Sequence, residues 1–373
     1  MSFNRELTLK YLKAGYNYAS SSSLTDLSIL TGKTLSKPKQ VYYLLTEKCN
    51  ARCLMCVNWE NGEKESKEEW ISINKMKEVL IDLANWKVPK FGISGGEPLL
   101  FEDRMFELLS TANSLGIYTH FISNGWLLNK DVFVRYDKMG GGHISLSLDG
   151  TKNVHDQMRQ MKGLYSRCIE VLETFKKLSL KNVHMKLNTV LCKNNLGEIG
   201  NLINISKEYD IPVYFQPVDL FNYESFLKLS QDEIAEKYSF WIPSNSNELL
   251  NNQIRTIKLF KRKFPHLVLN SERHLELIPN YFRKSIPSNI RRKCLAAFET
   301  MFIYPNGNVK VCQGNGLKWF SLKEIGIKEL YYSKQYDNVR KRALICKYPC
   351  MQGCVNRQSL WKLIKIGVRN IMN

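Results

Sequence analysis

Cys49-Asn-Ala-Arg-Cys53-Leu-Met-Cys56 places three cysteines within eight residues, just after the apolar run Val41–Leu45. Such close spacing is typical of metal sites, because a short loop must bring several thiolates to one place. Three thiolates leave a four-coordinate metal, or a cubane iron–sulfur cluster, one ligand short. The pattern therefore predicts either a cluster with an open position or a zinc knuckle with its fourth ligand elsewhere.

A second motif, Ser94-Gly95-Gly96-Glu97-Pro98, follows about forty residues later. In this order the two motifs resemble the radical S-adenosylmethionine (SAM) enzymes, and this resemblance disfavours the zinc alternative. It implies that Cys49, Cys53 and Cys56 hold a [4Fe–4S] cluster and that SAM chelates the open iron. An electron from a donor such as flavodoxin or ferredoxin would then cleave SAM to methionine and a 5′-deoxyadenosyl radical.

Strand and helix patterns alternate from about Lys37 onward. Apolar runs predict strands at Val41–Leu45, Phe91–Ser94, Tyr118–Ser123, His143–Leu148, Val183–Leu191 and Val213–Gln216. Helical periodicity appears between them at Lys67–Trp86, Phe101–Leu115, Lys130–Lys138, Leu164–Leu178 and Leu196–Tyr209. The expected fold is α/β, a partial (β/α)6 TIM-like barrel with a small C-terminal cluster-binding α+β extension.

Most of the residues that the family resemblance assigns to SAM follow the ends of these strands. For Glu97 the alternative is a cap on the next helix, and for Ser147 a structural turn. His155, close to Arg159, is expected to orient or pack rather than to bind metal. The implied SAM-binding set is Met55, Gly95, Gly96, Glu97, Ser123, Asn124, Ser147, Arg159, Asn188 and Val190.

A second group of cysteines begins at Cys294. With Gly307 and Cys312 it forms a C-x12-G-x4-C pattern around an expected hairpin, which resembles the SPASM and twitch extensions of radical SAM enzymes. The resemblance implies an auxiliary [4Fe–4S] cluster held by four of Cys294, Cys312, Cys346, Cys350 and Cys354, with Cys346 and Cys350 competing for one place. Zinc is the alternative here. Cys168 and Cys192 are expected to pack in the core.

Composition limits the class of protein. The chain has 373 residues, 44% hydrophobic and 24% charged, which is typical of a folded globular protein. It has no 18-residue apolar run and no signal-peptide pattern, and ten cysteines without a secretion signal predict a reducing, cytoplasmic location. From Tyr281 onward there are 18 Lys or Arg against 4 Asp or Glu. This bias predicts an anionic neighbour, or else a solvated basic face.

Five segments are expected. Residues 1–36 form a short amphipathic helix, which Ser20–Ser23 ends, and a loop. Residues 37–220 form the barrel, and residues 221–290 form helices that shape the substrate pocket or simply pack. Residues 291–356 form the auxiliary domain, and 357–373 a basic amphipathic helix that binds the inner membrane surface or docks on the barrel.

The expected substrate is a sugar, polyol or membrane-lipid headgroup, because both ends of the chain read as membrane-adjacent. The alternatives are a ribosomal-peptide maturase, against which the short segment 1–36 weighs because it is too small for a peptide-recognition domain, and a cyclitol dehydrogenase. Nucleic acid is not the expected partner, although a basic zinc protein that binds RNA is the non-enzyme alternative. Gln216 and Asp219, after the last barrel strand, are weak candidates for a catalytic base.

Overall fold

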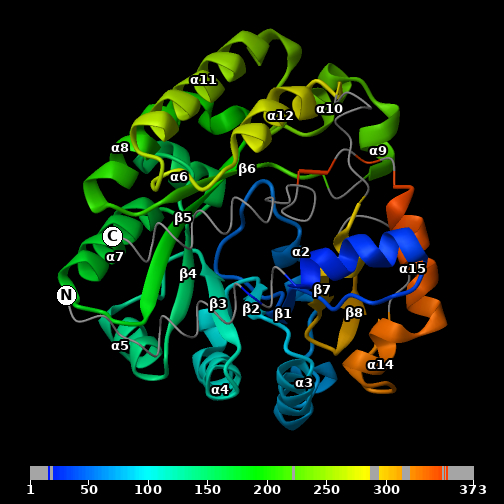
Figure 1. The fold of residues 1–373 in the computed structure, drawn as a ribbon. Coiled ribbons are helices and arrows are strands. Elements are labelled where there is room, and N and C mark those ends of the chain that lie inside the picture. The colour runs from blue at the N-terminus through cyan, green and yellow to red at the C-terminus, as the bar shows by residue number, and fades with distance from the viewer. Residues whose placement is uncertain are drawn as a thin grey trace.

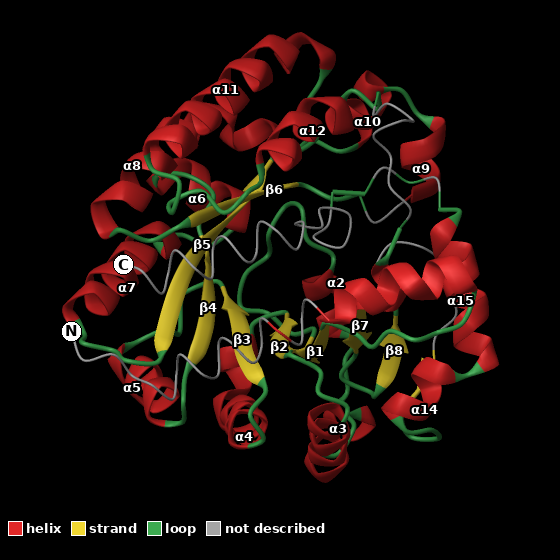
Figure 2. Ribbon diagram, in the orientation of Figure 1, coloured by secondary structure: helices red, strands yellow, loops and turns green. Residues whose placement is uncertain are grey.

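The computed structural model describes residue 16 and residues 20–220, 223–285, 294–312, 320–346, 348, 350 and 351. One curved sheet runs through these residues, and helices cover its outer face (Figures 1 and 2). The strand order is β6-β5-β4-β3-β2-β1-β7-β8-β9, and strands β6 and β9 form its two edges. The described sheet is therefore open, as a partial barrel requires.

The six predicted barrel strands are all present, and each begins and ends within one residue of its expected bounds. All five neighbouring pairs among them are parallel. Along β5, buried residues alternate with half-exposed or exposed ones. The buried side chains pack under the helices, and the more exposed side chains face the inside of the barrel. The strands are β1 (Gln40–Thr46), β2 (Lys90–Gly95), β3 (Tyr118–Ser123), β4 (Gly142–Ser147), β5 (Val183–Leu191) and β6 (Val213–Pro217).

The helices follow the predicted order with three corrections. The segment Lys67–Trp86 is not one helix, because the Ser72 side chain accepts a hydrogen bond from Lys75 N and starts a new one at Ile73. Two short helices, α2 and α6, were not predicted. The helical elements are α2 (Asn58–Glu63), η1 (Lys67–Glu69), α3 (Ile73–Asn85), η2 (Pro98–Phe101), α4 (Glu102–Ser114), α5 (Lys130–Lys138), α6 (Lys152–Arg159), α7 (Leu164–Lys177), η3 (Lys193–Glu198), α8 (Ile199–Tyr209), α9 (Tyr223–Lys228), α10 (Gln231–Lys237), η4 (Ser244–Ser246), α11 (Asn247–Lys263), α12 (Glu272–Phe282), α13 (Ala296–Glu299), α14 (Ile327–Tyr332) and α15 (Lys334–Leu344).

The C-terminal strands continue the barrel sheet. Strand β7 (Thr300–Ile303) pairs in parallel with β1, and the antiparallel strands β8 (Asn308–Lys310) and β9 (Phe320–Ser321) follow it. The expected hairpin turn lies between β7 and β8, where Gly307 has a φ of +83°. At the root of this extension Lys39 Nζ lies 2.5 Å from Glu299 Oε1, and both side chains are buried. The C-terminal region is thus fixed to the first barrel strand.

The N-terminal expectation was wrong at one point. Residues 20–31 are helical, so Ser20–Ser23 does not end a helix. Hydroxyl groups in this helix are satisfied locally, since Thr25 Oγ1 donates to Ser21 O over 2.8 Å and Ser28 Oγ donates to Leu24 O over 2.6 Å. The segment 357–373 lies outside the described residues. None of the described helices is long and apolar enough to cross a membrane.

Candidate active site

The cysteine loop lies between β1 and α2 and is docked on the end of α6. Leu54 N donates to Met158 O over 3.0 Å, and Arg52 N donates to Arg159 O over 3.3 Å. Within the loop Cys56 N donates to Cys53 O over 3.1 Å, which closes a turn. The positions of Cys53 and Cys56 are therefore set by backbone hydrogen bonds as well as by their side chains.

A cavity of about 240 Å³ lies at the carboxyl ends of the strands, and all three cysteines line it. Each of the strands β2 to β6 contributes one inward-facing residue to it: Ser94, Ile122, Ser147, Val190 and Gln216. Parallel barrels carry their chemistry at this end. The predicted residues Met55, Gly95, Gly96, Ser123, Asn124, Arg159 and Asp219 also line the cavity.

Gly95 and Gly96 are needed for backbone packing. A Cβ on Gly95 would lie 2.0 Å from Thr46 O, and one on Gly96 would lie 2.0 Å from Lys48 O. Gly95 also has a φ of +130°, which other residues rarely adopt. These glycines let the loop after β2 lie against the end of β1, and their backbone remains open to the cavity.

Glu97 is fully buried and does not line the cavity. Its carboxylate accepts hydrogen bonds from Asn124 N over 2.7 Å and from Leu99 N over 3.2 Å. Burial raises the pKa of Glu97 to about 7. The side chain caps η2, as the alternative prediction for Glu97 stated, and its bond to Asn124 N connects η2 to the turn after β3. A contact between Glu97 and SAM stays a prediction.

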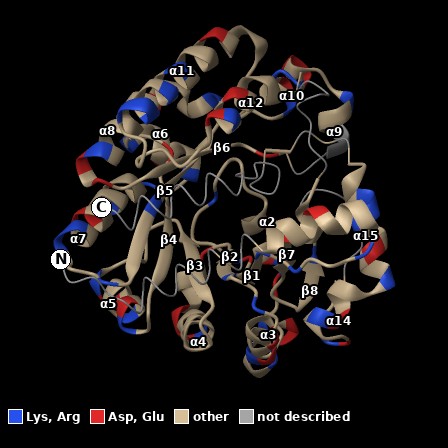
Figure 3. Ribbon diagram, in the orientation of Figure 1, with Lys and Arg blue, Asp and Glu red and all other residues tan. Residues whose placement is uncertain are grey.

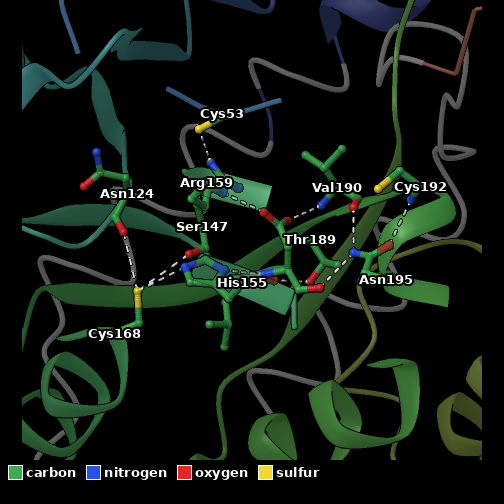
Figure 4. A network of polar contacts seen from close by, with 12 residues as sticks. Cys53, Asn124, Ser147, His155, Arg159, Cys168, Thr189, Val190, Cys192 and Asn195 are labelled. Atoms are coloured by element: carbon green, nitrogen blue, oxygen red, sulfur yellow. Dashed lines mark hydrogen bonds and ion pairs between the residues drawn. The ribbon is translucent and has the colours of Figure 1, made fainter. Parts of the chain in front are cut away.

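Arg159 joins the cavity to the strands behind it (Figure 4). Its Nε donates to Asp149 Oδ2 over 2.6 Å, and its Nη1 lies 3.8 Å from Cys53 Sγ. Burial opposes the guanidinium charge, but Asp149 and Cys53 together outweigh it and raise the pKa of Arg159. The other oxygen of Asp149 accepts from Val190 N over 2.8 Å. Arg159 is thus held as a cation beside one cysteine.

Uncharged side chains beside the Arg159–Asp149 ion pair hold it in place. His155 Nδ1 accepts a hydrogen bond from Asp149 N over 3.1 Å, and burial lowers the pKa of His155 to about 4. Asn195 Nδ2 donates to Asp149 O and to Val190 O, each over 2.8 Å. Cys168 and Cys192 are fully buried beside these residues, as expected for core thiols (Figure 4). His155 orients the loop after β4 and is not arranged as a metal ligand.

Several contacts at the rim were not predicted. Asn58 Nδ2 donates to Gly95 O over 3.1 Å, and Trp59 Nε1 donates to Cys53 O over 3.3 Å. Both residues line the cavity, and their position directly after Cys56 was the available signal. Asn188 does not line it; its carbonyl accepts from Leu148 N over 3.1 Å.

The residues on either side of Cys350 lie near the mouth of the same cavity. Gln216 Nε2 is 3.4 Å from Met351 O, and Tyr348 OH donates to Asp219 Oδ1 over 2.7 Å. Cys294, Cys312, Cys346 and Cys350 are half-buried, whereas Cys354 lies outside the described residues. Their ligation of an auxiliary cluster stays a prediction.

The donor set of the cavity fits a [4Fe–4S] cluster with SAM. Nowhere in the described part of the chain do three His, Cys, Asp or Glu side chains converge as ligands of a single ion. A cubane needs no such convergence, since it takes one thiolate at each of three corners. Exposed glycine backbone and the Arg159 cation, suited to a carboxylate, complete the lining.

Residues 43–204 match the family model of the radical SAM superfamily. These residues therefore form a radical SAM domain. Among its curated relatives, the Fe-coproporphyrin III synthase of Methanosarcina barkeri is 25% identical over 259 residues, which cover 69% of this chain and 61% of the relative. The PqqA peptide cyclase of Bradyrhizobium diazoefficiens is 26% identical over 181 residues, or 48% of this chain and 46% of the relative. The chain thus spans about half to three-fifths of the length of these two relatives.

The fold is shared with solved structures that contain bound S-adenosylmethionine. Streptococcus suis SuiB bound to S-adenosylmethionine superimposes with a TM-score of 0.63 at 16% identity, covering 82% of this chain and 68% of SuiB. SuiB has also been solved with its precursor peptide SuiA. A [4Fe–4S] cluster and SAM are the cofactors of this superfamily, and the cavity around Cys49, Cys53 and Cys56 is the part of this chain that would hold them.

Proposed function

We propose that this radical SAM enzyme modifies a peptide substrate. The observation that carries the proposal is the single cavity in which three thiols, bare glycine backbone and a buried arginine meet at the barrel mouth. Support for the peptide comes from two relatives: the similar PqqA enzyme is a peptide cyclase, and SuiB, which shares the fold, binds a precursor peptide. Neither these relatives nor the described residues give support to the sugar or lipid-headgroup reading.

When bound, the cluster and SAM supply a 5′-deoxyadenosyl radical that removes a hydrogen atom from the substrate. Cys49, Cys53 and Cys56 are the proposed cluster ligands. The Arg159 guanidinium, fixed by Asp149, is the proposed partner of the SAM carboxylate. The backbone of Gly95 and Gly96 is proposed to border the methionine group of SAM.

After a hydrogen atom has been removed, loss of a second hydrogen requires the substrate radical to give up a proton and an electron. An auxiliary cluster held by the second cysteine group would take the electron, and Asp219 is the proposed acceptor of the proton. Among the described residues that line the cavity, Asp219 carries the sole carboxylate. Tyr348 OH donates to it over 2.7 Å and so fixes its orientation. Gln216, which lies on β6 three residues before Asp219, is proposed to orient the substrate backbone by its amide.

The test uses anaerobically reconstituted protein with SAM and a reductant. A peptide fraction and a separate carbohydrate and lipid fraction of a cell lysate are added in parallel. The proposal predicts that the peptide fraction raises 5′-deoxyadenosine formation and that a peptide loses two hydrogens by mass, an effect that Asp219→Asn reduces. Stimulation by the carbohydrate and lipid fraction alone would contradict the peptide assignment.

A further inference from the structure

A group of basic side chains lies on the inner face of the barrel, below the cavity. On each strand, residues two or four positions apart point to the same side. Lys90, His143 and Lys186 each stand four positions before a cavity-lining residue, namely Ser94, Ser147 and Val190. His120 stands two positions before Ile122. At about 3.3 Å per residue, these side chains begin roughly 7 to 13 Å from the cavity wall.

These residues lie on adjacent strands in register. His120 is opposite His143, and His143 is opposite His184, with the centroids of the last two rings 6.1 Å apart. Tyr118 OH is 3.1 Å from His143 Nδ1. Gly92 makes room for the group, since a Cβ there would lie 2.3 Å from the His120 ring. We refer to Lys90, His120, His143, His184 and Lys186 together as the basic inner patch.

The residues of the patch lower one another's pKa values. Burial lowers the pKa of His120, and Lys186, Lys90 and His143 lower it further. Burial and then Lys90 lower the pKa of Lys186 to about 8. Only His184 has an acid, Asp137, among the groups that shift its pKa. The three histidines are therefore neutral near pH 7, and the positive charge of the patch comes from Lys90 and Lys186, which repel each other. An added anion would relieve that repulsion.

The patch is also open to a ligand. Lys90, His120, His143 and Lys186 are half-buried, and His184 is exposed. Lys186 Nζ lies 5.6 Å from the Tyr214 ring centroid, so its stem follows the inner surface of the sheet. Among the described residues, many other Lys and Arg side chains belong to the helices (Figure 3). Ammonium groups, imidazole N–H groups and a tyrosine hydroxyl on one surface suit the oxygens of a carboxylate or phosphate.

We infer that the basic inner patch binds an acidic group of the substrate, a carboxylate or a phosphate, while the reacting C–H lies at the cavity. The inference rests on the proposed function, because it places both groups of one substrate along a single inner face. In a peptide substrate the acidic group is a side-chain or terminal carboxylate. The separation predicts that the acid lies roughly 7 to 13 Å from the reacting carbon.

The test measures anion binding to the reconstituted holoenzyme in the presence of SAM. Inorganic tripolyphosphate and a pentaglutamate peptide are titrated separately by calorimetry. We expect at least one probe to bind and Lys186→Gln to weaken it about tenfold or more, since one charged partner is lost. Lys186→Arg should retain most of the affinity, and Lys177→Gln, on the exposed side of α7, should leave it unchanged. The tighter probe identifies the carboxylate or the phosphate.

Two results would overturn the inference: neither probe binds the wild-type holoenzyme, or Lys186→Gln binds as tightly as wild type. Lys90→Gln, on a different strand, gives a second reading if Lys186→Gln does not fold. Formation of 5′-deoxyadenosine without any probe is recorded on the same samples. Its absence would contradict the proposed function, whereas its presence without anion binding would overturn only the inference about the patch.

Discussion

Arg159 Nε lies 2.6 Å from Asp149 Oδ2, and this buried ion pair links the cysteine loop to the end of β4. The carbonyl oxygen of Arg159 accepts a hydrogen bond from Arg52 N in the cysteine loop. Asp149 Oδ1 accepts a hydrogen bond from Val190 N in β5. Replacing Asp149 by Asn leaves a buried guanidinium without its counter-charge. We expect the free energy of unfolding to fall by about 3 kcal/mol, and SAM binding to weaken because Arg159 loses its fixed position.

Chemical denaturation and SAM titration check this prediction. The matched control is Asp103→Asn, because Asp103 pairs with Arg135 at the surface and its side chain is 95% exposed. The control should leave stability unchanged within error. Equal effects of the two substitutions would show that the Arg159–Asp149 pair has no special structural role.

Gly95→Ala tests the close approach of two loops. The new Cβ would lie 2.0 Å from Thr46 O at a φ of +130°. We expect a loss of roughly 3 kcal/mol or more in stability, with reduced iron content, because strain and overlap add at one point. Gly200→Ala in α8 is the control, since nothing lies within 4 Å of its added Cβ. That variant should be as stable as wild type or more stable by up to about 1 kcal/mol. A Gly95→Ala protein with normal melting temperature and iron content would refute the packing argument.

The sequence predicted the barrel well because each strand is a short apolar run between loops. It failed at Ser72, whose side chain caps a helix, and at Ser20–Ser23, which lie inside one. Serine occurs in both places, so the residue type alone does not decide between them. It also did not predict that β7 would join β1, since parallel pairing between residues some 260 positions apart leaves no local pattern.

The buried Lys39–Glu299 pair tests how the C-terminal strands are attached. Lys39→Met leaves the Glu299 carboxylate buried without its cation and should cost about 3 kcal/mol or more. The double variant Lys39→Met, Glu299→Leu removes both charges and should recover most of that loss. Thermal and denaturant unfolding of both variants checks this. A double variant less stable than the single one would contradict the account.

Lys186 gives a prediction for the pH dependence of stability. Its pKa of about 8 in the folded protein lies below the value of about 10.4 in an unfolded chain. Between these values the unfolded chain holds more protons, so stability should rise as pH increases from 8 to about 10.4. The wild type should therefore gain up to about 3 kcal/mol relative to Lys186→Met across this interval. Parallel stability curves for the two proteins would contradict the lowered pKa of Lys186.

Motif reading located most of the candidate site, since Cys49, Gly95, Arg159 and Val190 all line one cavity. It could not distinguish the two readings of Glu97, because capping and ligand binding use the same carboxylate. The basic inner patch was missed altogether. Its lysines and histidines are scattered through the sequence from residue 90 to 186, and only the strand register brings them together.

The central claim is tested most directly by iron content and SAM cleavage in cysteine variants. Wild-type protein reconstituted without oxygen should hold roughly eight irons per chain if both cysteine groups carry a cubane, and it should form 5′-deoxyadenosine with SAM and reductant. The Cys49→Ala, Cys53→Ala, Cys56→Ala triple variant should lose about four of these irons and all SAM cleavage, while Cys168→Ala, in the core, should retain both. Continued 5′-deoxyadenosine formation by the triple variant would contradict the assignment of the active site.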